Sequence, residues 1–126
     1  MNKELVYVCS PLSAKTPEGI KANMQKAKEY TRIVSEIFNC RAIAPHSFLP
    51  EYLDDAVPEE RSLAIRFGQD LIKLCSKVVV CGNVISSGMK SEIDLAKKLG
   101  IPVIQLAEKK KPSVRIAVAW IEGEEL

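Results

Sequence analysis

The sequence predicts a single α/β domain, residues 1–126, in which helices cover both faces of a four- or five-stranded parallel β-sheet. Short apolar runs rich in β-branched residues alternate along the chain with longer segments of helical periodicity. No repeat, low-complexity segment or linker divides the 126 residues. A chain of this length buries roughly two thirds of its unfolded surface, so it needs neither disulfide nor metal to fold.

The first strand is expected at residues 5–9, where it is followed by a polar loop and a long helix. Thr16 is a suitable N-cap, and Pro17 stands at the first helical position. Apolar residues then recur at helical spacing over residues 20–38. Asn39 tolerates the left-handed conformation that closes many helices, so the helix should end there.

The second strand is expected at residues 41–44 and the second helix after Pro58. Pro45–His46 ends the strand, and an irregular, partly aromatic loop fills residues 47–57. The apolar face of the second helix reaches Cys75. This segment therefore supplies one more strand and one more helix in alternation.

The clearest strand–helix–strand unit spans residues 77–104. A β-branched run at residues 78–81 predicts a strand buried on both faces. The helix is expected at about residues 87–99, because Gly100 can close it and Pro102 cannot continue it. A fourth strand follows at residues 102–106.

The last twenty residues leave one alternative open. Residues 108–112 form a charged segment, for which we expect an exposed connection with a solvated lysine run. Residues 113–121 are apolar and β-branched and include Trp120, a pattern compatible with a fifth strand or a short helix.

Strands that alternate with helices indicate right-handed βαβ units and a three-layer sandwich. With four or five strands, the flavodoxin-like order 2-1-3-4-5 is favoured over a complete Rossmann fold. In that order the sheet reverses between its first and third strands, and ligands bind at such a point. Residues 10–13, residues 83–88 and the loop that begins at His46 should therefore border one crevice.

Several classes of function lose support from the sequence. There is no Gly-x-Gly-x-x-Gly after the first strand and no Gly-Lys-Ser/Thr loop, so we expect no dinucleotide or nucleoside triphosphate cofactor. The four cysteines lack metal-ligand spacing, and we expect buried thiols and no metal site. A net charge of +2, with one basic run at residues 109–111, argues against a nucleic-acid partner.

The cellular setting is also an expectation from the sequence. No apolar run approaches the ~18 residues that a membrane helix needs, so no membrane partner is predicted. The N-terminus passes directly into the first strand without the pattern of a signal peptide. The expected compartment is the cytoplasm.

Polar side chains gather at the predicted crevice, and each has a structural alternative. Free N–H groups and the helix dipole favour an anion at Ser86-Ser87-Gly88, although Ser87 is also a suitable N-cap. Glu92 lies in the early part of its helix, which suits a nucleophile or base, but a glutamate there also complements the dipole. Asp70 is either solvated or directed into the crevice, His46 is either a ligand or a satisfied strand-end histidine, and Tyr7 is either ligand or core.

The ordered set of motifs resembles the nucleoside 2′-deoxyribosyltransferase superfamily. Its closest pattern is that of the deoxyribonucleoside 5′-monophosphate N-glycosidases, and it is similar to an uncharacterised bacterial and phage branch of the superfamily. The segments that carry the resemblance are Val6-Tyr7-Val8-Cys9-Ser10, Ala44-Pro45-His46, Glu60-Arg61, Gln69-Asp70-Leu71, Ser86-Ser87-Gly88-Met89-Lys90-Ser91-Glu92 and Leu99-Gly100-Ile101-Pro102-Val103.

The resemblance implies an N-glycosidic bond as the target. Glu92 would attack C1′ of the sugar, as in a retaining glycosidase, and water or a second base would resolve the glycosyl-enzyme. Asp70 would hold the sugar or base and help to protonate the departing base, and Tyr7 would orient Glu92. Ser86 matches the position that contacts the phosphate, which implies a nucleoside 5′-monophosphate as the small-molecule partner. The expected substrate-binding residues are Ser10, Ser13, Asn23, His46, Ser86, Ser87, Gly88 and Met89.

Two further readings stay open. The loop after the first strand is Pro11-Leu12-Ser13, where the relatives carry glycine and arginine. A non-catalytic module that senses or sequesters a nucleotide is therefore the second hypothesis, and a structural domain without a pocket is the third. By the resemblance we also expect a homo-oligomer, with residues 113–121 as a candidate interface.

Overall fold

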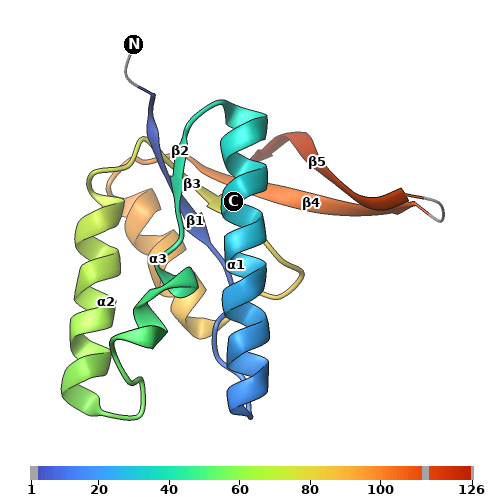
Figure 1. Ribbon diagram of the computed structural model, residues 1–126. Helices are drawn as coiled ribbons and strands as arrows, with labels where there is room; N and C mark the ends of the chain where they lie inside the picture. The colour runs from blue at the N-terminus through green and yellow to red at the C-terminus, as the bar shows by residue number, and fades with distance from the viewer. Residues whose placement is uncertain (1–2, 112–113, 126) are drawn as a thin grey trace.

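The computed structural model describes residues 3–111 and 114–125, with side chains described as far as residue 106. Strands and helices alternate along most of the chain, as Figure 1 shows. The elements are β1 (Leu5–Cys9), α1 (Pro17–Phe38), β2 (Arg41–Ile43), the short 3-10 helices η1 (Pro45–Ser47) and η2 (Leu49–Glu51), α2 (Pro58–Ile72), β3 (Lys77–Val80), α3 (Ser87–Lys98), β4 (Val103–Lys111) and β5 (Val114–Glu125).

The five strands form one sheet in the order β2-β1-β3-β4-β5. Strands β2, β1, β3 and β4 are parallel, so the predicted α/β class and the predicted 2-1-3-4-5 order are confirmed. The fifth strand corrects the expectation of an all-parallel sheet, because β5 runs antiparallel to β4. Only residues 112–113 separate these two strands, and a parallel crossover needs a dozen residues or more.

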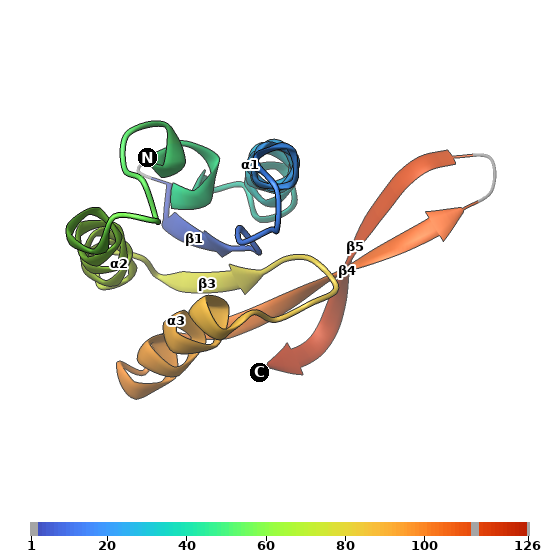
Figure 2. The same ribbon diagram turned by 90° about the horizontal axis from the view of Figure 1, so that it is seen from below.

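The charged segment after the fourth strand is the second correction. We expected an exposed connection at residues 108–112, but β4 continues to Lys111 and pairs with β5 through Glu108↔Val118 and Lys109↔Ala117. An antiparallel partner supplies the ladder hydrogen bonds that keep such a segment extended. The resulting ribbon reaches away from the body of the domain (Figures 1 and 2). The side chain of Trp120, expected at an interface, lies outside the described part.

The sheet separates two apolar cores, with α1 on one face and α2 and α3 on the other (Figure 2). Strand β1 contributes to both cores because successive side chains of a strand point to opposite faces. Val6 and Val8 pack toward α1, and Tyr7 and Cys9 pack toward α2 and α3. This alternation brings a hydroxyl and a thiol to the face that carries Glu92.

The long first helix begins and ends where the sequence predicts. The Thr16 side chain accepts a hydrogen bond from the Gly19 backbone N–H at 3.0 Å, and Pro17 is the first helical residue. Asn39 closes the helix with φ 48°, in the left-handed region. Among the described helices, none is both long and apolar enough to cross a membrane.

Candidate active site

Glu92 lies on α3 at the border between the buried and exposed faces of that helix. The buried face is formed by Met89, Ile93 and Ala96, which recur at the helical spacing of three or four residues. Glu92 precedes Ile93 and is partly exposed. The packing of α3 against the sheet therefore directs a carboxylate toward the end of β1 while leaving it open to solvent on one side.

Both oxygens of Glu92 have a hydrogen-bond donor from β1. The Tyr7 hydroxyl donates to Oε2, and the Cys9 thiol donates to Oε1 at 3.3 Å. Tyr7 is 1% exposed and Cys9 is 0% exposed. Burial, and next the charge of Glu92, raise the pKa of the Tyr7 hydroxyl and of the Cys9 thiol above their usual values. Both groups therefore stay protonated as donors at neutral pH.

Helix α2 approaches this pair through Gly68, which is buried. A Cβ built at Gly68 would lie 3.1 Å from the Tyr7 hydroxyl oxygen and 3.2 Å from Glu92 Oε2. These distances are shorter than ordinary van der Waals contacts, so a side chain at this position would press on both groups and displace them by a few tenths of an ångström. Sequence reasoning missed this residue. The available signal was a glycine inside a helix, which costs about 1 kcal/mol relative to alanine and indicates a packing reason.

The structure does not bring Asp70 to Glu92. The Asp70 side chain is 69% exposed, and its carboxylate lies 3.7 Å from Lys73 Nζ on the outer surface of α2. Two residues turn an α-helix by about 200°, so Asp70 points away from the side on which Gly68 faces Glu92. Asp70, which the sequence suggested as a second carboxylate of the site, therefore lies on the side of α2 that faces away from Glu92.

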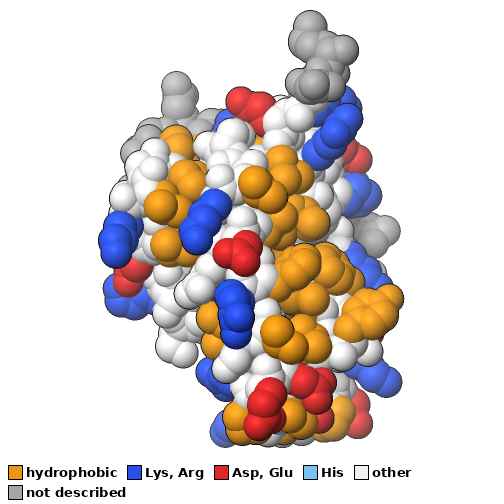
Figure 3. Space-filling view, turned by 90° about the vertical axis from the view of Figure 1, so that its left-hand side faces the viewer, with side chains coloured by type: hydrophobic (Ala, Val, Ile, Leu, Met, Phe, Trp, Pro, Cys, Tyr) orange, Lys and Arg blue, Asp and Glu red, His pale blue; other side chains and the backbone are white. Residues whose placement is uncertain are grey.

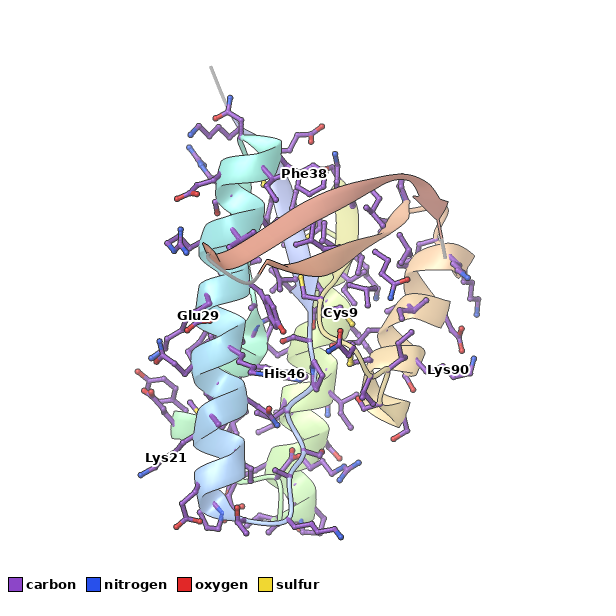
Figure 4. The ribbon with its side chains drawn as sticks, turned by 90° about the vertical axis from the view of Figure 1, so that its right-hand side faces the viewer. Cys9, Lys21, Glu29, Phe38, His46 and Lys90 are labelled. Atoms are coloured by element: carbon purple, nitrogen blue, oxygen red, sulfur yellow. The ribbon has the colours of Figure 1, made fainter. Side chains whose placement is uncertain are left out.

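His46 and Ser10 meet at the same end of the sheet as Cys9 (Figure 4). Nδ1 of His46 lies 2.7 Å from the Ser10 carbonyl oxygen. A carbonyl oxygen only accepts hydrogen bonds, so Nδ1 of the partly exposed ring carries a proton and donates a hydrogen bond to Ser10. The Ser10 hydroxyl is 1% exposed and has no hydrogen-bond partner among the described residues. The structure thus places both predicted residues side by side at the carboxyl end of β1.

The loop after β1 is held by Asn23 from α1. The Asn23 side-chain amide donates to the Leu12 carbonyl at 2.8 Å, while Ser13 is exposed on the same loop. Pro11 in turn packs on Gly82, whose φ of +99° requires glycine and whose Cβ position lies 3.2 Å from the Pro11 ring. The loops that follow β1 and β3 are therefore in contact. Asn23, predicted to bind substrate, braces this loop.

The N-terminus of α3 corrects two expectations. Its N-cap is Ser86, not Ser87, because the Ser86 hydroxyl accepts from the Met89 N–H at 3.2 Å. Ser87 and Gly88 follow as the exposed first residues of the helix. Met89, expected to bind substrate, is 0% exposed and lies in the core between α3 and the sheet. Its apolar side chain is buried between α3 and the sheet, so it anchors the first turn of the helix by packing.

No group of three or more potential metal ligands occurs among the described residues. The described site is therefore a carboxylate with two neutral donors, a histidine and the start of a helix. Such a set can supply a nucleophile or base and can hold an anion.

Residues 4–106 match the family model described as Domain of unknown function (DUF7768). No curated protein matches the chain. Among solved structures, a 2-deoxyribosyltransferase from the psychrotolerant bacterium Bacillus psychrosaccharolyticus is similar with a TM-score of 0.61 and 14% sequence identity. The likeness covers 80% of this chain and 70% of that chain, and at this identity it shows a shared fold. Because the family model spans most of the chain, this protein belongs to the DUF7768 family, on a fold it shares with a 2-deoxyribosyltransferase.

Proposed function

We propose that this protein cleaves the N-glycosidic bond of a (deoxy)nucleoside 5′-monophosphate, with Glu92 as the nucleophile. The observation that carries the proposal is the hydrogen bonding of Glu92 by two residues of β1: Tyr7 in the middle of the strand and Cys9 at its carboxyl end, beside the end of β3. Parallel sheets bind ligands at this end, where their strand order reverses. The fold neighbour is itself an enzyme, a 2-deoxyribosyltransferase.

The proposed reaction has two steps. In the first, a Glu92 oxygen bonds to C1′ while the C1′–N bond breaks, and the electron pair leaves with the base nitrogen, which takes up a proton from solvent. In the second, the oxygen of a water bonds to C1′ while the bond between C1′ and the Glu92 oxygen breaks. The electron pair of that bond restores the Glu92 carboxylate, and the water gives up a proton to solvent. Tyr7 holds the carboxylate throughout as a neutral donor. Hydrolysis is proposed over transfer, because no second-base site is apparent from the sequence.

The start of α3 is the proposed site for the 5′-phosphate. The first N–H groups of a helix have no partner within the helix, and the positive end of its dipole attracts anions. At this helix those groups belong to Ser87 and Gly88, beside the Ser86 hydroxyl. His46, which is partly exposed at the end of β1, is proposed to bind the rest of the substrate, whereas the Ser10 hydroxyl is buried.

The test is a panel of ribo- and deoxyribonucleoside 5′-monophosphates and the matching nucleosides, with free base measured by chromatography. The proposal expects base release from monophosphates, and a loss on the order of 10³-fold or more in Glu92→Gln, which keeps the shape of the side chain. Base release that persists in Glu92→Gln would refute the role of Glu92. A preference for bare nucleosides would refute the phosphate site.

A second function, a non-catalytic nucleotide-binding module, is favoured by one specific observation. Retaining glycosidases place two carboxyl groups about 5–5.5 Å apart. Here α2 presents Gly68 to Glu92, and Asp70 is directed outward. Tight binding of a nucleotide that is recovered unchanged, with no turnover across the panel, would establish this function in place of hydrolysis.

We also propose that the chain forms a homo-oligomer. Large apolar side chains are exposed on α2 and on the segments just before and after it, and Figure 3 shows the apolar patches on this side of the molecule. They are Tyr52, Leu63, Ile65, Phe67 and Leu74. Light scattering after size exclusion should give more than one chain per particle at micromolar concentration, and a monomer would contradict this proposal.

A further inference from the structure

We propose that Cys9 is a positioning residue for the nucleophile, and that it directs Oε1 of Glu92 as the oxygen that attacks C1′. This inference rests on the proposed function for its chemistry. It rests on the structure for its geometry, which a spectroscopic measurement can test without any turnover.

The two oxygens of Glu92 lie in different surroundings. Oε2 accepts the hydrogen bond of the buried Tyr7 hydroxyl, and the backbone of α2 closes over it at Gly68. There is no room at Gly68 for even a methyl group at an ordinary contact distance from Oε2. A sugar carbon therefore cannot approach Oε2 from the α2 side. Among the residues whose side chains are described, the hydrogen-bond donor to Oε1 is the thiol of Cys9, at 3.3 Å.

Cys9 is well placed to fix the direction of Oε1. It is the last residue of β1, pairs with Val80 of β3, and is 0% exposed, so its backbone and side chain are held by the sheet. The Met89 carbonyl is a second acceptor within reach, at 3.9 Å from Sγ, but Oε1 is nearer. The single thiol proton is thus directed to Glu92.

The weakness of a thiol donor suits this role. A thiol hydrogen bond is weaker than that of a hydroxyl, so it orients the carboxylate while neutralising little of the negative charge needed for attack. Burial and the charge of Glu92 raise the pKa of the thiol, and Cys9 therefore keeps its proton throughout the reaction. When Oε1 bonds to C1′, the C1′–N electron pair leaves with the base, and Oε2 becomes the carbonyl oxygen that Tyr7 still binds.

The contact itself is tested by the S–H stretching band in infrared spectra. The Cys9 band is identified as the one that disappears in Cys9→Ala. In Glu92→Gln, that band should move to higher wavenumber, because a neutral amide is a weaker acceptor than a carboxylate. An unchanged band would overturn the proposal. This readout holds whether or not the protein releases a base from any nucleotide.

The consequence for catalysis is tested with matched cysteine variants. Cys9→Ala should lower kcat about tenfold and leave KM within about twofold, and Cys9→Ser, which restores a donor, should recover part of the loss. Cys75→Ala is the control, because Cys75 lies in the same core and donates at the same 3.3 Å, but to the Leu71 carbonyl. It should leave kcat unchanged.

The outcomes separate the two proposals. Equal kcat values in Cys9→Ala and Cys75→Ala, with active wild type, would overturn the positioning role alone. A wild-type protein that releases no base from any nucleotide would overturn the proposed function, while the infrared shift would still decide whether Cys9 binds Glu92.

Discussion

The two faces of the sheet use alternate residues of the same strand for different purposes. On the α1 face, β1 contributes Val6 and Val8, which pack among apolar side chains. On the α2/α3 face, it contributes Tyr7 and Cys9, whose hydroxyl and thiol donate hydrogen bonds to Glu92. All four side chains are nearly or completely buried. Burial therefore does not distinguish core from site in this domain; the chemistry of the buried atoms does.

This difference has an energetic origin. A buried hydroxyl or thiol without a partner costs free energy, so its presence in a strand core requires an acceptor nearby. On the α2/α3 face that acceptor is a carboxylate that α3 holds at the solvent border. Val6 and Val8 of β1 are expected to determine stability alone, and Tyr7 and Cys9 both stability and activity.

The largest effect that would sharpen this comparison is expected for Tyr7→Phe. Hydrogen bonds to charged groups contribute about 1.5–3 kcal/mol, so loss of the donor should lower kcat/KM roughly 10- to 100-fold. Tyr30→Phe makes the same change in the core on the α1 face and should alter kcat/KM less than about twofold. Steady-state kinetics on the best nucleotide would check both. Equal losses in the two variants would remove the distinction between the faces.

A stability effect without a kinetic effect is expected for Val8→Ala. Val8 is 2% exposed on the α1 face, and removing two buried carbons should cost about 2 kcal/mol of unfolding free energy. Urea unfolding measures the loss, and kcat should stay within about twofold of wild type. Cys9→Ala, at the next position, should instead lower kcat more than it lowers the unfolding free energy. A large fall in kcat for Val8→Ala would show that the α1 face also shapes the site.

A smaller effect, on the unfolding free energy at alkaline pH, is expected from the Cys75 thiol of the α2/α3 face. Burial raises the pKa of Cys75 to about 11, from a usual value of 9.0. The folded state thus favours the neutral thiol, so its contribution to stability is complete below pH 9 and is lost as the pH rises toward 11. Urea unfolding from pH 7 to pH 10.5 should show this fall. Its slope should be smaller in Cys75→Ala, and an identical slope would contradict the assignment.

The smallest effect is expected for Asp70→Asn. Asp70 is exposed and forms one surface ion pair with Lys73, and such pairs contribute about 0–1 kcal/mol. Both kcat/KM and the unfolding free energy should therefore change little, by less than about twofold and about 0.5 kcal/mol. A loss of activity as large as that of Tyr7→Phe would mean that α2 turns Asp70 inward when substrate binds.

Most of the fold was predictable because its signals are local. The cap at Thr16, the turn residue Asn39 and the β-branched run before Gly82 each determine an element without help from distant residues. The short strands then allow few orders, and 2-1-3-4-5 is the one observed. The direction of β5 was not predictable from periodicity, since parallel and antiparallel strands have the same side-chain periodicity. The length of the connection to β4 was the available signal.

The site was predictable in part, for a related reason. Tyr7 and Glu92 are 85 residues apart and were linked through family resemblance; their hydrogen bond is a structural result. Asp70 was placed near Glu92 by its motif, but the rotation of α2 is set by packing, and packing selects Gly68 for that side. Cys9 was predicted to be a buried thiol, and it is buried. The Cys9 thiol reaches Glu92 because Cys9 lies on the face of β1 that α3 covers, and the sequence does not show which face that is.

The central claim is that Glu92 forms a covalent bond to the sugar, and intact-protein mass spectrometry tests it most directly. The wild-type protein and Glu92→Gln are mixed with the most active nucleoside 5′-monophosphate, quenched in acid within one turnover, and digested to locate any added mass. The proposal expects the mass of a sugar phosphate on the peptide that contains Glu92, in wild type and not in Glu92→Gln. Base release without any adduct on that peptide, or an adduct on another residue, would contradict it.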